Sequence, residues 1–116
     1  MRLAIIGGRD FKDYALLANT IFNSLCPLDF ITAIISGGAK GADILGENFA
    51  ENNGIDCIIY KPEWDKYGKS AGFIRNQTIV DNCDMVLAFW DGESRGTANT
   101  IAKAKKAKIP TFIVYY

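Results

Sequence analysis

Five short runs of apolar residues, spaced at similar intervals, limit this chain to very few folds. The runs cover residues 3–6, 33–35, 57–60, 85–90 and 112–115, and they are rich in β-branched and aromatic residues. They lack the alternation of apolar and polar residues that marks a half-exposed strand. Such runs are typical of strands that are covered on both faces in a parallel sheet. The sequence therefore predicts five buried, mostly parallel strands.

Helical patterns fill the gaps between these runs. The periodicity predicts one helix that ends before Pro27, a second from Ala42 to the Asn53-Gly54 cap, a third over about 70–82, and a fourth from Ala98 into a lysine-rich end. Residues 61–69 are predicted to be irregular. Because strand–helix–strand crossovers are almost always right-handed, this order predicts one α/β domain over residues 1–116, a Rossmann-like doubly wound sheet with helices on both faces.

Composition excludes several classes of function. Thirteen basic residues balance thirteen acidic ones, so the chain has no general attraction for nucleic acid or for an anionic membrane. The absence of histidine excludes His-based catalysis, and Cys26, Cys57 and Cys83 are too far apart in sequence to suggest a zinc motif. We therefore expect no metal, no cofactor and no membrane partner, and reduced thiols predict a cytoplasmic location.

Glycine-rich segments follow the first, second and fourth predicted strands, at the edge where open parallel sheets bind ligands. Glycine permits close approach of the backbone, and the N–H groups at the start of the following helix attract anions. The spacing fits neither a Walker A loop nor a G-x-G-x-x-G motif. The alternative is that these turns simply pack tightly. The candidate ligand-binding residues in the three segments are Gly7, Gly8, Arg9, Asp10 and Phe11; Ser36, Gly37, Gly38, Gly41 and Asp43; and Asp91, Gly92, Ser94, Gly96 and Thr97.

Three further residues join this set. Arg75, followed by Asn76, is placed to bind a phosphate with two hydrogen bonds, although a surface ion pair is the alternative. Trp64 is a candidate for stacking on a base, and its alternative role is to cover the edge of the core.

The motifs Gly7-Gly8-Arg9-Asp10-Phe11, Ser36 to Asp43, Arg75-Asn76 and Asp91 to Thr97, in this order, resemble the SLOG superfamily. The resemblance covers essentially the whole chain and is to the small branch related to YspA and YpsA. The superfamily also holds the Lonely guy phosphoribohydrolases and the DNA-processing protein DprA. The resemblance implies a nucleotide site with phosphate and ribose at the two glycine loops, a homo-oligomer, and, in several members, a role in conflict between phages and bacteria.

One departure from the enzymatic members bears on function. The phosphoribohydrolases carry a catalytic glutamate shortly after their Gly-Thr pair, whereas Gly96-Thr97 is followed here by Ala98, Asn99 and Thr100. Cleavage of an N-glycosidic bond develops positive charge that a carboxylate stabilises. Glu93, Asp91 and Asp43 are the possible substitutes, although Asp43 is more readily explained as a helix cap or a ribose contact.

Three hypotheses follow. The first is a sensor or sequestering protein for a nucleoside phosphate, an ADP-ribose-like molecule or a cyclic nucleotide. The second is a nucleotide N-glycosidase, with Glu93 as its candidate catalytic residue. The third, a DprA-like binder of single-stranded DNA, is disfavoured by the zero net charge.

Overall fold

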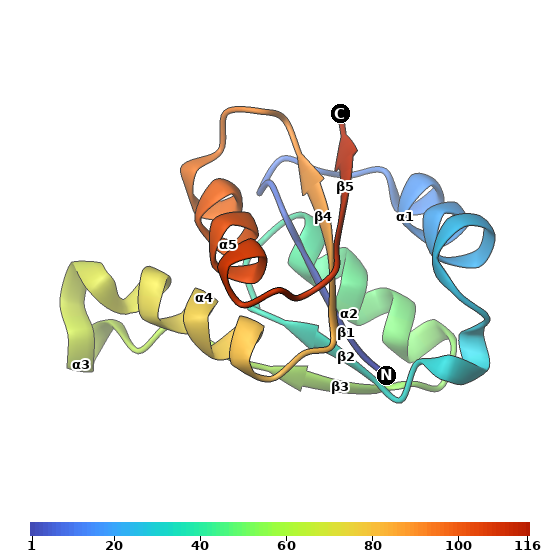
Figure 1. The fold of residues 1–116 in the computed structure, drawn as a ribbon, viewed down its shortest axis with the longest axis horizontal. Coiled ribbons are helices and arrows are strands. Elements are labelled where there is room, and N and C mark those ends of the chain that lie inside the picture. Colours follow the sequence, from blue (N-terminus) through green and yellow to red (C-terminus); the bar gives the residue numbers. More distant parts are fainter.

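The computed structural model describes all residues, 1–116, and shows a single parallel sheet (Figure 1). Its strands lie in the order β3-β2-β1-β4-β5, and every neighbouring pair is parallel. This confirms the predicted α/β fold. The strands are β1 (Arg2–Gly7), β2 (Ala33–Ser36), β3 (Asp56–Ile59), β4 (Met85–Trp90) and β5 (Thr111–Tyr115).

Two helices cover each face of the sheet (Figure 1). On one face lie α1 (Tyr14–Thr20) and α2 (Ala42–Asn52), and on the other α4 (Ala71–Asp81) and α5 (Arg95–Lys106). α1 continues into a π-helical turn, Ile21–Leu25, and a 3-10 turn, Leu28–Phe30, follows Pro27.

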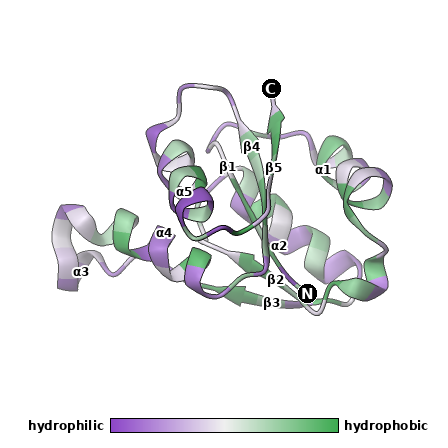
Figure 2. Ribbon diagram, in the orientation of Figure 1, coloured by the Kyte–Doolittle hydropathy of each residue, from purple (hydrophilic) through white to green (hydrophobic).

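Alternate residues of β1 supply the two halves of the core. Leu3 and Ile5 pack among the side chains of α1 and α2, and Ala4 and Ile6 pack among those of α4 and α5. All four are buried. The strands are largely green in Figure 2 because a strand buried on both faces has few polar positions. The uninterrupted apolar pattern of β1 and β4 thus has a direct structural cause.

Both edge strands depart from the prediction of five covered strands, since neither β3 nor β5 has a buried residue. All four residues of β3 are exposed, although Cys57, Ile58 and Ile59 continue the apolar pattern. β3 pairs only with β2, and its helix contacts are with α2. An apolar run alone does not distinguish an edge strand from a central one.

The prediction of an irregular connection over residues 61–69 was wrong. This segment contains a short helix, α3 (Trp64–Tyr67), and a 3-10 turn, Gly68–Ser70, that runs into α4. Neither element buries a residue in the core, and α3 projects from the body of the molecule beyond α4 (Figure 1). Its helical turn is too short to produce a periodic apolar pattern.

The strand order has one topological switch point. The chain first builds outward from β1 through β2 to β3, and then crosses to β4 and β5 on the other side of β1. In such sheets a crevice opens between the loops that leave the two strands at the switch point, here β1 and β4. None of the helices is both long and apolar enough to cross a membrane.

Candidate functional site

A cavity of about 980 Å³ lies at this switch point, and we call it the cleft. Its walls are the loops after β1, β2 and β4 together with the segment that leads into α4. The segments predicted to form one site therefore surround one space. The predicted site residues that line the cleft are Gly7, Gly8, Arg9, Asp10, Gly37, Gly38, Asp43, Trp64, Arg75, Asn76, Asp91, Ser94, Gly96 and Thr97.

Five other candidates do not line the cleft. Phe11 lies in the core, where its ring stacks on Phe89 with ring centroids 4.4 Å apart. Gly92 and Glu93 lie on an exposed turn. Ser36 is fully buried, and Gly41 packs against the backbone of Gly8. Both residues therefore have structural roles beside the cleft.

The loops after β1 and β2 pack backbone against backbone. A Cβ at Gly41 would collide with the carbonyl oxygen of Gly8, and one at Gly7 would lie 2.8 Å from the Cβ of Ala42. Ala42 N–H donates to the Gly8 carbonyl at 3.2 Å. Gly7 and Gly41 are therefore required for the approach of the two loops, whether or not a ligand is present.

The loop after β2 is held by side chains of its own region. Gly38 N–H donates to Ser36 Oγ at 3.1 Å, and Ala39 N–H donates to Asp43 Oδ2 at 3.2 Å. Ser36 is fully buried and donates to Glu47 Oε2 at 2.7 Å. The Gly38 and Ala39 N–H groups are therefore already occupied, contrary to the expectation of free donors. At the start of α2 the N–H groups of Lys40 and Asp43 have no partner in the chain.

Arg75 joins α4 to the loop after β2. Its Nη1 donates to the carbonyl of Gly37, and its Nε donates to Asn76 Oδ1 at 3.0 Å. Asn76 in turn donates to Asn99 Oδ1 at 3.1 Å and to the Gly96 carbonyl at 3.4 Å. Burial lowers the pKa of Arg75, while Asp43 opposes that shift. Arg75 forms no ion pair, and its Nη2 makes no hydrogen bond, so a donor remains at the cleft wall.

The loop after β4 prepares the start of α5. Asp91 Oδ1 accepts hydrogen bonds from the N–H groups of Glu93 at 2.9 Å and Ser94 at 2.8 Å, which hold the pKa of Asp91 below its usual range. Ser94 Oγ accepts from Thr97 N–H at 3.5 Å. The Gly96 N–H has no partner in the chain, and a Cβ at Gly96 would meet nothing within 4 Å. This helix start therefore offers an open approach to its positive end.

Asp43 is the buried carboxylate of the cleft, at 5% exposure. Burial raises its pKa to about 6, whereas the Ala39 N–H and the charge of Arg75 favour the ionised form. Glu47 adds to the upward shift because it is a second carboxylate nearby.

Positive charge is concentrated in the cleft, although the chain as a whole is neutral. Three acidic side chains, Asp10, Asp43 and Asp91, line it alongside five cations. The cations are Arg9, Lys40, Lys61, Lys69 and Arg75. Three of these, Lys40, Lys61 and Lys69, were not predicted as site residues, because a lysine in a loop gives no periodic signal. Lys40 could have been predicted from its position inside the Ser36 to Asp43 motif.

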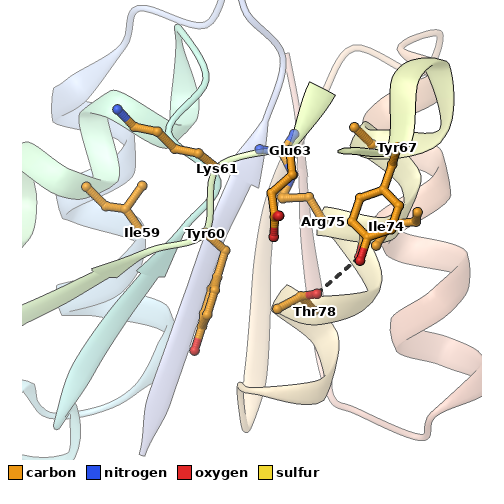
Figure 3. A pocket seen from close by; sticks show the side chains of 9 residues that line it. Ile59, Tyr60, Lys61, Glu63, Tyr67, Ile74, Arg75 and Thr78 are labelled. Carbon is orange, nitrogen blue, oxygen red and sulfur yellow. Dashed lines mark hydrogen bonds between the residues drawn. The ribbon is translucent and has the colours of Figure 1, made fainter. Parts of the chain in front are cut away.

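A smaller cavity of about 230 Å³ adjoins the cleft under the chain that enters α3 (Figure 3). Tyr60, Tyr67 and Ile74 contribute to its walls, and it shares Lys61 and Arg75 with the cleft. Figure 3 shows the Arg75 side chain beside Glu63. Its volume is below the usual range of small-molecule sites, so it forms an annex of the cleft. No group of three or more Cys, Asp or Glu side chains is arranged to hold a metal ion.

Comparison with known proteins identifies relatives. The profile of YAcAr, described as the YspA, cpYpsA-related SLOG family, matches residues 1–67. The Gene 61 protein of Mycobacterium phage D29 is 31% identical over 115 residues, which cover 94% of this chain and 92% of that protein. No solved structure matches. The chain belongs to the YspA, cpYpsA-related SLOG family, as the order of its glycine motifs predicted.

Proposed function

We propose that this chain binds a nucleotide-derived phosphorylated ligand in the cleft. One observation carries the proposal, namely the five cations that line the cleft of a neutral chain. Three carboxylates, Asp10, Asp43 and Asp91, also line it, so the cations are in excess. An excess of positive charge inside a concave site attracts an anion. Membership of a SLOG family supports a nucleotide-related ligand.

In this proposal the phosphate lies between Arg75 and the start of α5. Arg75 supplies an unpaired Nη2. The N–H of Gly96, with no side chain in front of it, supplies a backbone donor at the positive end of a helix. Asn76 bridges the two walls, because it follows Arg75 and donates to the Gly96 carbonyl. A phosphate there would receive donors from two elements.

The base is assigned to the aromatic side of the cleft. Trp64 and Phe73 both line it, and they are 54% and 52% exposed. Large aromatic side chains left open in a cleft gain contact when a planar base stacks on them. The proposed ligand therefore spans from Gly96 to the α3 end of the cleft.

The proposed role is that of a sensor or sequestering protein that keeps its ligand intact. The chain carries no carboxylate in the three positions after Gly96-Thr97. The relative from a mycobacterial phage fits a role in conflict between phages and bacteria. We also propose that the protein is cytoplasmic, because nucleotides and reduced thiols occur together in that compartment. The proposed assembly is a homo-oligomer.

Isothermal titration calorimetry tests the proposal with AMP, ADP, ATP, cyclic AMP, NAD and ADP-ribose. At least one of these should bind, and Arg75→Gln should weaken binding at least tenfold, because a charge-assisted hydrogen bond is lost. Lys106→Gln is the matched control, since it removes one charge from the exposed far end of α5. Absence of heat with every compound would refute the proposal.

A specific observation also favours the N-glycosidase hypothesis. Asp43 presents a carboxylate with a pKa of about 6 at the cleft wall, which suits a general acid or base near neutral pH. The earlier candidate, Glu93, lies on an exposed turn outside the cleft. Chromatography of a bound nucleotide after long incubation with equimolar protein separates the two functions. Release of a free base would support hydrolysis, and intact ligand would exclude it.

A further inference from the structure

Asp43 differs from the other acidic residues of the cleft. Asp10 and Asp91 are exposed, whereas Asp43 is more than nine-tenths buried. Burying a carboxylate is costly unless hydrogen bonds compensate it. The contacts of its two oxygen atoms therefore indicate what this side chain does.

The first oxygen, Oδ2, holds the loop after β2. Asp43 lies in the first turn of α2, where an acidic side chain commonly caps the helix, but no side chain caps α2. Oδ2 accepts instead from the N–H of Ala39, outside the helix. This removes the helix cap as an explanation and accounts for only one oxygen.

The second oxygen, Oδ1, is open to the cleft. No N–H or O–H of the chain donates a hydrogen bond to it. The Gly37 N–H lies near the carboxyl group and favours its ionised form, and the carboxylate oxygen next to Gly37 is Oδ2. No fully enclosed side-chain oxygen or nitrogen in the protein lacks a partner. Oδ1 is therefore reached from the cleft that Asp43 lines. A free acceptor in that position calls for a donor on the ligand.

Arg75 does not satisfy this acceptor. The two side chains flank Gly37, whose missing Cβ would lie 2.5 Å from Arg75 Nη1 and 2.7 Å from Asp43 Oδ2. Nevertheless they form no ion pair, because Nη1 donates to the Gly37 carbonyl. The cleft thus presents a cationic donor and an anionic acceptor side by side. A phosphate suits the first and is repelled by the second, whereas a sugar hydroxyl suits the second.

We propose that Asp43 Oδ1 accepts a hydrogen bond from a ribose hydroxyl of the ligand and thereby selects ribonucleotides over their deoxy counterparts. This inference rests on the proposed nucleotide function. A ribose phosphate carries the two chemical groups that the adjacent Arg75 and Asp43 recognise. Loss of one hydroxyl leaves the carboxylate oxygen buried without a donor, which a site of this kind strongly disfavours.

Calorimetry with the 5′-mono- and diphosphates of adenosine and guanosine, each as the ribose, 2′-deoxy and 3′-deoxy form, tests the inference. The wild-type chain should bind the ribose form about tenfold or more tightly than at least one deoxy form, the ratio expected for one charge-assisted hydrogen bond. Equal affinity for all three sugar forms would overturn the inference and leave the proposed function standing. Failure of all these nucleotides to bind would overturn the inference, whereas the proposed function is refuted only if ATP, cyclic AMP, NAD and ADP-ribose also give no heat.

Asp43→Asn assigns the preference to this residue. Asparagine keeps an acceptor for the Ala39 N–H and removes the charge. In this variant the ribose-to-deoxy ratio should fall toward one, whereas disturbance of the loop alone would weaken all sugar forms alike and leave the ratio unchanged. The second result would overturn the assignment to Asp43. Glu47→Gln is the matched control, because it removes a neighbouring charge while keeping an acceptor for Ser36, and it should preserve the ratio.

Discussion

The contact between the loops after β1 and β2 predicts a large loss of stability in Gly41→Ala. Gly41 has a φ of 81°, and a Cβ there would collide with the Gly8 carbonyl and lie 2.6 Å from the carbonyl carbon of Arg9. With ψ at −127°, this positive-φ backbone is one that glycine alone adopts readily, and it costs alanine about 1–3 kcal/mol. The collision is with backbone, which must shift, and overpacking of this kind adds about 1–3 kcal/mol. We expect Gly41→Ala to lower the free energy of unfolding by about 3 kcal/mol in total.

Gly54→Ala separates the cost of the positive-φ backbone from the cost of the collision. Gly54 also has a positive φ, 65°, but a Cβ there would meet nothing within 4 Å. This variant should lose only about 1 kcal/mol. Urea denaturation, followed by far-UV circular dichroism, measures both differences, and an unchanged m-value would show that the unfolded state is not affected. If Gly41→Ala were no more destabilising than Gly54→Ala, the described packing of the two loops would be wrong.

Four further predictions concern the cleft. Gly96→Ala should leave the urea midpoint unchanged or raise it slightly, because a Cβ there meets nothing and alanine favours helix. The added methyl group should weaken the affinity for the nucleotide measured by calorimetry. Unchanged affinity would contradict the proposed position of the phosphate. Arg75→Lys keeps the charge but not the planar fork, and should lower that affinity about tenfold; wild-type affinity would show that charge alone suffices. Because the pKa of Asp43 is raised from 3.8 to about 6, its contribution to stability is complete below about pH 4 and is lost as the pH rises through 6. Asp43→Asn should therefore remove a pH dependence of about 3 kcal/mol in urea titrations, and a parallel pH profile would refute this. Nucleotide should change the fluorescence of the wild type more than that of Trp64→Leu, in which Trp90 remains and its indole N–H donates to Ser94 at the cleft. An equal change in both would remove Trp64 from the site.

The sequence predicted the parts of this structure that depend on local patterns. The runs around Ile5 and Leu87 lack polar positions because both faces of the central strands are buried. These runs, together with the helical patterns between them, led to the fold class. The glycine motifs at three strand ends gave the location of the cleft because parallel strands share one carboxyl edge. The same pattern was misleading for Ile58 in β3, which is apolar but 41% exposed, because β3 is an edge strand with one neighbour.

The remaining features depend on tertiary contacts that no local pattern encodes. Phe11 belongs to a glycine motif, yet its ring lies in the core and contacts Phe89 of β4 and Tyr116, the residue after β5. Gly41 looked like a phosphate-loop glycine, but its partner is the backbone after β1. The open oxygen of Asp43 could be recognised only once Ala39 was found to occupy the other one.

Net charge is a poor guide to this molecule because the fold separates its charges. The neutral total argued against strong anion attraction, and over distances beyond the Debye length, about 8–10 Å in physiological salt, that argument still holds. Inside the cleft, however, Arg75 lies much closer than this to any bound group, and burial limits the screening that it experiences. Long-range electrostatic attraction should therefore add little to the association rate of a phosphate, whereas its contact with Arg75 should add much to the binding energy. Added salt should accordingly change the association rate only slightly, whereas removal of Arg75 should act mainly by accelerating dissociation.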